Sequence, residues 1–362
     1  MRRMTYLPNG AALSCLIPLS RFTVGPLVTL AAPFFKYVSA PDQSPVTAHT
    51  STAHTSAKRW LAKFGGEFVA VDGHTRMGRT EHFGPLRVQR PFYPEGLGCL
   101  HLYLLHPPGG LVGGDRLLIE LVAKSQSHVL MTTPSAGKVY RNISDLSQGQ
   151  QVTLTVASGA HLEYLPQENI IFDGADAELT TEVDISGDGV FVGWEITCLG
   201  RFESREMFRQ GRLMQSLIIR REGRPLFSDR LCLTADEGED LSALPAGVQT
   251  MPRVDLQKSH AGFQGFSVFG TFVISADVMS DTQEDNLTKQ LLALQETVNN
   301  RSPKNTADGM TQLALTQKPG VFIARILGNK AETVRQTFEE VWRLTRAQVV
   351  GRKACPPRIW RT

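Results

Sequence analysis

Two neighbouring stretches decide the fold class: residues 178–185 read ELTTEVDI, and residues 190–199 read VFVGWEITCL. The first alternates polar and apolar side chains, which is the period of a strand with one buried face. The second is almost continuously apolar and rich in β-branched and aromatic residues, which indicates a strand covered on both faces. Between them, Gly187-Asp188-Gly189 provides residues that favour a tight turn. The pattern predicts two successive strands, the second of them in the interior.

The same patterns recur along the chain from Trp60 onward. Residues 86–89 and 151–156 alternate, whereas residues 117–122 and 266–274 are apolar runs that predict further strands covered on both faces. The 32 glycines and 20 prolines cluster between these runs, where turns need them. Two late segments instead place apolar side chains on one helical stripe. We therefore predict a mainly β body over residues 58–362, with C-terminal helices near 282–298 and 331–346.

Residues 1–57 differ in composition from the rest of the chain. They contain four basic residues but a single acidic one, and they repeat the pentapeptide TAHTS at 47–51 and 52–56. Prolines and Arg21 interrupt the apolar part before it reaches membrane-spanning length. We predict a disordered extension and no membrane segment.

Charge and cysteine content exclude several classes of protein. The chain has 38 Lys+Arg and 35 Asp+Glu, a formal charge of +3 that is too small and diffuse for a nucleic-acid partner. Its five cysteines are odd in number and contain no CxxC pair, which argues against a disulfide framework or a zinc ribbon. Free cysteines are typical of a reducing compartment, so we predict a cytoplasmic protein.

The common enzyme motifs are also missing. The sequence has no GxSxG and no HExxH. Residues 133–138, TPSAGK, lack the first glycine of a phosphate-binding loop, and Val139 stands where Ser or Thr would hold magnesium. A nucleotide site and a hydrolase are both disfavoured.

The segment PPGGLVGGD, residues 107–115, is the most unusual local sequence. Two prolines stiffen its entry, four glycines permit close backbone approach, and Asp115 emerges where the next strand begins. Two interpretations remain open: a structural turn in which Asp115 hydrogen-bonds its own backbone, or a carboxylate that meets a ligand or partner.

Three acids are predicted to point into places where water is scarce: Glu195 and Asp229 share strand faces with apolar residues, and Glu163 shares one with His161. A buried unpaired charge costs several kcal/mol and persists only with a partner. One explanation is ion pairing with neighbours such as Arg201 or Arg230. The other is a polar passage through the β body, in which spaced carboxylates bind a divalent cation weakly and release it again.

The same regions carry a resemblance to a known family. The motifs are long and follow one order: GPLRVQRPFYPE at 84–95, CLHLYLLHPPGG at 99–110, GGD at 113–115, KVYR at 138–141, LEYLPQE at 162–168, FDGA at 172–175, CLGR at 198–201 and PRIW at 357–360. Over residues 58–362 the chain resembles the urease accessory protein UreD family, also called UreH.

That resemblance implies a β body of helically stacked strands with two C-terminal helices. It also implies a non-enzymatic maturation chaperone that binds apo-urease and the accessory protein UreF, with UreF recruiting the GTPase UreG, which brings nickel. Ni²⁺ would then move transiently through an internal passage, GTP would bind the partner UreG, and this chain would hold no tightly bound cofactor.

Individual residues follow from the resemblance together with the strand pattern. The predicted stations for nickel are the carboxylates of Asp115, Glu163, Glu168, Glu195 and Asp229. The predicted partner-binding residues are Lys138, Tyr140 and Arg141. Two alternatives stay open: a purely structural scaffold without metal transit, and a metal-dependent hydrolase in which these acids and His161 converge on one tight site.

Overall fold

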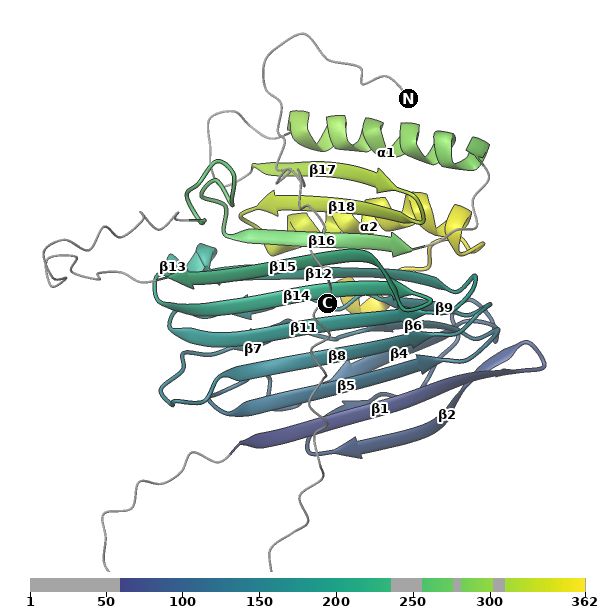
Figure 1. The fold of residues 1–362 in the computed structure, drawn as a ribbon, viewed down its shortest axis with the longest axis horizontal. Coiled ribbons are helices and arrows are strands. Elements are labelled where there is room, and N and C mark those ends of the chain that lie inside the picture. Colours follow the sequence, from purple (N-terminus) through teal and green to yellow (C-terminus); the bar gives the residue numbers. More distant parts are fainter. Residues whose placement is uncertain (1–58, 236–255, 276–280, 302–309, 362) are drawn as a thin grey trace, which may run out of the picture. The chain divides into compact units, whose positions relative to one another are not determined.

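Two β-sheets that share one hydrophobic core form the body of the protein (Figure 1). The computed structural model describes residues 59–235, 256–275, 281–301 and 310–361, which belong to a unit comprising residues 57–362. The predicted disordered extension, residues 1–57, lies outside the described residues. Among the described residues, no helix combines the length and apolarity that crossing a membrane requires.

The first sheet has seven strands. Their order is β15 (Arg224–Ala235), β14 (Gly211–Arg221), β11 (Ala175–Ile185), β8 (Gln148–Val156), β5 (Asp115–Ala123), β1 (Trp60–Val71) and β2 (His74–Phe83). The second sheet has eleven strands. Its main path is β17 (Thr311–Lys318), β18 (Val321–Gly328), β16 (Val268–Ser275), β12 (Val190–Arg201), β9 (His161–Tyr164), β6 (His128–Thr132), β4 (Leu100–Leu105) and β3 (Arg87–Val88), and the short strands β7 (Gly137–Val139), β10 (Asn169–Ile171) and β13 (Glu206–Met207) lie off it.

The chain alternates between the two sheets as it proceeds. Strands β1, β5, β8, β11 and β14 pair in parallel in the first sheet, while β4, β6, β9 and β12 do so in the second. Parallel neighbours need a crossover, and here each crossover passes through a strand of the opposite sheet. Figure 1 shows the result: the strand colours run from purple at β1 and β2 to yellow-green at β17 and β18. The predicted stacked β body is confirmed.

Burial follows from which face of each strand has a neighbouring layer. In β12 nearly every side chain is buried, because one face meets the first sheet and the other meets helix α2 (Ala331–Val349). The prediction for residues 117–122 was wrong. Burial alternates along β5, and Glu120 is exposed, since the described residues place no further layer on the outer face of the first sheet. The predicted strand at 86–89 also shortens, to Arg87–Val88.

Both predicted helices are present and slightly longer than expected. Helix α1 spans Asp281–Arg301 and α2 spans Ala331–Val349. Helix α2 packs on β12, β16 and β18 through Phe338 and Trp342, which join Trp194 in a second hydrophobic core. Gly270 permits this close approach, because a Cβ there would lie 2.7 Å from the Phe338 ring. The second sheet therefore has two faces of different character: a sheet-facing side and a helix-facing side.

Candidate functional site

A row of polar side chains lies between the sheets around Glu195. Thr181 on β11 donates a hydrogen bond to Glu195 Oε1 at 2.5 Å, and Gln215 on β14 donates to Oε2 at 2.9 Å. Thr197 in turn donates to Gln215 at 2.9 Å. Burial raises the pKa of Glu195, and the nearby charge of Asp229 raises it further, although the two hydrogen bonds oppose the shift. The row is a polar break in an otherwise apolar core.

Asp229 extends the row toward one edge of the sheets. Its Oδ2 lies 2.9 Å from the guanidinium of Arg325 on β18, and both side chains are partly exposed. In the first sheet, Thr181 and Asp229 are both in register with Leu217. Asp229 thus forms an ion pair, but with a residue distant in sequence and not with Arg201 or Arg230.

A cavity of about 70 Å³ lies between the sheets and continues the row in the other direction. This volume is large enough for several water molecules, since one needs about 10–15 Å³. Leu179, two residues before Thr181 on the same face of β11, lines the cavity together with Tyr164. Burial raises the pKa of Tyr164, and the charge of Glu195 adds to this, so the cavity lining lies within electrostatic reach of the polar row.

His106 lies at the cavity, and Asp115 lies close enough for its charge to act on His106. His106 lines the cavity, and burial lowers the pKa of this imidazole while the charge of Asp115 opposes the shift. Asp115 is buried and accepts a hydrogen bond from the backbone N–H of Val112 at 2.9 Å, and its own N–H donates to the Val112 carbonyl at 3.0 Å. The carboxylate therefore closes the glycine-rich turn, as the first of the two sequence interpretations expected.

The predicted partner-binding residues are spread around the same end. Lys138 lines the cavity. The Tyr140 ring packs against Phe172, with 4.9 Å between centroids, and Arg141 is exposed in an ion pair with Asp173 at 2.7 Å. Lys138 and Tyr140 are thus partly buried, and Arg141 is the exposed one of the three.

Glu168 lies in the loop between β9 and β10 and is partly buried. Its neighbours Gln167 and Asn169 line the cavity, whereas its own charge helps burial to raise the pKa of Cys198, which belongs to the core beneath α2. Glu168 therefore stands at the rim of the cavity and not within the polar row.

Glu163 belongs to a different place. On β9 it is in register with Val192, so it lies on the helix-facing side of the sheet, opposite to Glu195. It is fully buried and accepts hydrogen bonds from Trp342 Nε1 at 2.7 Å and from Arg346 Nε at 3.0 Å, and His128 Nε2 lies 2.7 Å from its Oε1. The sequence-predicted acids are thus not brought together in one site.

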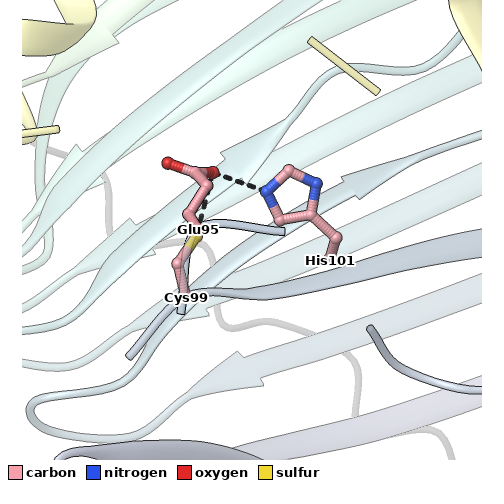
Figure 2. Close-up of side chains that lie close together, drawn as sticks. All are labelled: Glu95, Cys99 and His101. Atoms are coloured by element: carbon pink, nitrogen blue, oxygen red, sulfur yellow. Dashed lines mark hydrogen bonds and ion pairs between the residues drawn. The ribbon is translucent and has the colours of Figure 1, made fainter. Parts of the chain in front are cut away.

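Arg346 links Glu163 to a second buried carboxylate, Glu95. Its Nη1 lies 2.6 Å from Glu95 Oε2, and its Nη2 lies 2.8 Å from Oε1. Figure 2 shows Glu95 between Cys99 and His101, whose Nε2 is 2.6 Å from Glu95 Oε1. Burial opposes ionisation of Glu95, but the hydrogen bonds from His101 and Arg346 outweigh it and lower the pKa of this carboxyl to about 2.

Sequence reasoning missed Glu95, His128 and Arg346. Arg346 is separated from Glu95 by 251 positions and from Glu163 by 183, so no local spacing connects them. One signal was present: Arg346 follows Trp342 by four residues and therefore falls on the apolar stripe of the predicted helix. An arginine on such a stripe predicts a buried acidic partner.

Within the described residues, two groups of side chains are close enough to share a metal ion. They are Glu95, Cys99 and His101, and Cys99, His128 and Glu163, with the ligand atoms of each group within 4.8 Å of one another. Both groups lie on the helix-facing side. Asp115, Glu195 and Asp229 are in neither group, so a tight site of the kind that the hydrolase alternative requires does not form from them.

Comparison with known proteins agrees with the sequence motifs. A family model described as the UreD urease accessory protein matches residues 62–361. The urease accessory protein UreD of Saccharophagus degradans is 38% identical over 307 residues, covering 84% of this chain and 94% of the relative. The UreD proteins of Dechloromonas aromatica (38% over 303 residues, 84% and 95%) and Alcanivorax borkumensis (36% over 326 residues, 88% and 99%) are similar over nearly their whole length.

Proposed function

Since the chain belongs to the UreD urease accessory protein family and so has a role in urease maturation, we propose that it acts as a non-enzymatic chaperone with a passage for Ni²⁺. In this proposal it binds apo-urease and UreF, and through UreF it works with the GTPase UreG. Nickel is cargo here, taken up at one end and released to the nascent urease site.

The observation that carries the passage is a succession of polar groups between the sheets. His106 and Tyr164 line the cavity at one end, the charge of Glu195 acts on Tyr164, and the charge of Asp229, near the opposite edge, acts on Glu195. The surrounding core is apolar, so burying these groups there costs stability. A polar line kept at that cost supports a role beyond packing.

The chemistry of the polar row suits the transit of a metal ion and not its tight binding. Its carboxylates are separate, and each is held by protein partners, so an ion meets one carboxylate at a time. Burial also raises the pKa of Glu195, which favours the neutral form and weakens its hold on a cation. Tight nickel binding would need several fixed ligands in one place. The proposal keeps Asp115, Glu195 and Asp229 as the carboxylates that bind Ni²⁺ transiently, with Glu168 at the rim of the cavity.

The test compares isosteric variants of inner and outer carboxylates. Glu195→Gln and Asp229→Asn keep side-chain shape but remove the charge, and Glu182→Gln removes a carboxylate from the outer side of β11, where Glu182 pairs with Arg220. Each full chain is co-expressed with apo-urease, UreF and UreG. We expect unchanged complex formation in all three, with lower nickel content of urease only for the inner variants.

Two other outcomes decide between the alternatives. Loss of apo-urease or UreF from the pull-down would favour the pure scaffold, an alternative supported by the fact that Glu195 and Asp229 already have protein partners. Wild-type nickel content in both inner variants would refute the passage. A hydrolase would instead require purified chain that keeps about one metal through dialysis and turns over a substrate.

A further inference from the structure

On the helix-facing side, we propose that Glu95, Cys99, His101, His128 and Glu163 form a second cation site, for a resident divalent ion of the zinc, cobalt and nickel class. This site is independent of the passage and of the nickel cargo. Its ligand atoms come from the loop before β4 and from β4, β6 and β9, and they form two groups that share Cys99.

The donor set selects the class of ion. One thiol, two imidazoles and two carboxylates are the ligands that zinc and its neighbours accept, whereas magnesium and calcium prefer oxygen alone. His101, His128 and Glu163 are at most 3% exposed, so water does not compete for them. The ligand atoms of each group lie within 4.8 Å of one another before any ion is bound.

Arg346 marks where a positive charge is stable in this cluster. Its Nη2 lies 2.8 Å from Glu95 Oε1, 2.9 Å from Glu163 Oε1 and 3.8 Å from Cys99 Sγ. The second oxygens are held separately: Arg346 Nη1 binds Glu95 Oε2, and Trp342 Nε1 binds Glu163 Oε2. The guanidinium is a rigid planar fork, so an ion that takes the place of Nη2 moves Nη1 and Nε away from the carboxylates as well. Trp342 Nε1 then still anchors Glu163 Oε2 to α2, and such outer hydrogen bonds are what orient metal-binding carboxylates.

The two histidines have a nitrogen to spare. Each imidazole is hydrogen-bonded at Nε2 to a glutamate Oε1, while Nδ1 is buried without a hydrogen-bond partner among the described residues. Figure 2 shows His101 Nε2 facing Glu95 and the other ring nitrogen on the far side. Nδ1 can therefore take the ring proton when Nε2 becomes a ligand, and no hydrogen bond at Nδ1 is lost.

Charge balance favours a divalent ion once the thiol is ionised. Two carboxylates and one thiolate carry three negative charges, which one divalent ion and Arg346 neutralise together. Burial raises the pKa of the Cys99 thiol, and the charges of Glu163 and Glu95 add to this while Arg346 and Arg352 oppose it. Binding must therefore break the S–H bond, form the metal–sulfur bond and release the proton to solvent.

The test uses Co²⁺ on the reduced, full-length chain. We expect one Co²⁺ per chain, a near-ultraviolet thiolate-to-cobalt absorption band, loss of that band on adding Zn²⁺, and proton release in a weakly buffered titration. Cys99→Ser should abolish the band. The matched control is Cys198→Ser, which changes the other cysteine that is buried among the described residues and should keep the band.

A second variant guards against misfolding of Cys99→Ser. Serine replacement of Cys15, Cys198, Cys232 and Cys355 leaves Cys99 as the single thiol, and the band should persist in that chain. The Glu195→Gln chain should also keep it, even if the passage proposal fails. Absence of a band in the wild type, or an equal band in a folded Cys99→Ser chain, would overturn the proposal.

Discussion

Replacing Arg346 by methionine tests how strongly the buried network holds helix α2 to the β body. Both Arg346 and Glu163 are fully buried, and Glu95 is 8% exposed at its side chain. Methionine fills most of the space without supplying charge. Leaving buried carboxylates without their cation costs about 3–5 kcal/mol. We expect the free energy of unfolding to fall by that amount.

Urea unfolding followed by tryptophan fluorescence measures the loss, because Trp342 and Trp194 lie in the affected core. With an m-value of about 3 kcal/mol/M, the midpoint should fall by about 1 M or more. Arg325→Met is the matched control: its ion pair with Asp229 has the same 2.9 Å separation as Arg346 with Glu163, but side chains 48% and 36% exposed. An exposed pair contributes about 0–1 kcal/mol, so its midpoint should hardly move.

Bond length and substitution are the same in both variants, which differ in burial and in that Arg346 pairs with two carboxylates. Adding Glu163→Gln to Arg346→Met should recover part of the stability, because one of the two orphaned charges is then removed. Equal losses in the two arginine variants, or no recovery in the double variant, would refute the view that desolvated charge dominates this network.

Further predictions concern acid stability, tight turns and the partner surface. The pKa of Glu95 is lowered to about 2, so the stability that its ionised form contributes, roughly 3 kcal/mol, is fully present above the ordinary value of 4.5 and is lost as the pH falls from 4.5 toward 2. Acid titration followed by circular dichroism should place the main loss of stability in that window, and unchanged stability down to pH 2 would contradict this prediction. Gly200→Ala should lower the melting temperature more than Gly223→Ala. Both glycines have φ above +70°, but of the two only a Cβ at position 200 meets a backbone carbonyl oxygen, at 2.3 Å. Equal losses in melting temperature would show that the φ angle alone matters. Arg141→Glu should weaken pull-down of UreF or apo-urease, and its loss of stability should stay near the roughly 0–1 kcal/mol typical of an exposed ion pair, because Arg141 is exposed where it pairs with Asp173. Arg79→Glu on β2 serves as the control, since Arg79 is also exposed.

Strand periodicity predicted the fold well wherever a strand lies next to a complete layer. Residues 190–199 are covered on both faces as expected, because sheet and helix flank β12. For residues 117–122 the same reasoning failed, although Glu120 already interrupted the run. Composition alone does not reveal whether a sheet has a layer on its outer face. A single acid within an apolar run is therefore strong evidence that one face of the strand is exposed. The apolar residues around it are weaker evidence that both faces are covered.

The alternation of side chains along a strand predicted which face of the sheet an acid occupies, but not which residue forms its hydrogen bond or ion pair. Glu195 lies between the sheets with Thr197, as alternation along the strand required. Its hydrogen-bond donors Thr181 and Gln215 come from the opposite sheet, where facing residues depend on how the sheets stack and not on sequence spacing. The partner of Asp229 is 96 positions away for the same reason.

Glu163 and Glu195 point to opposite faces of the second sheet, so the sheet has two separate polar networks. Glu163 is in register with Val192, so an apolar sheet layer separates its network from the row around Glu195. In the first network, side chains on α2 bind the buried carboxylate of Glu163, and losing them leaves buried charge. In the second, neutral donors bind Glu195 and a half-exposed ion pair holds Asp229, so a single change there lowers the free energy of unfolding less. Changes beneath α2 should therefore lower stability more than isosteric changes between the sheets, and the changes between the sheets are the ones that test the proposed passage of Ni²⁺.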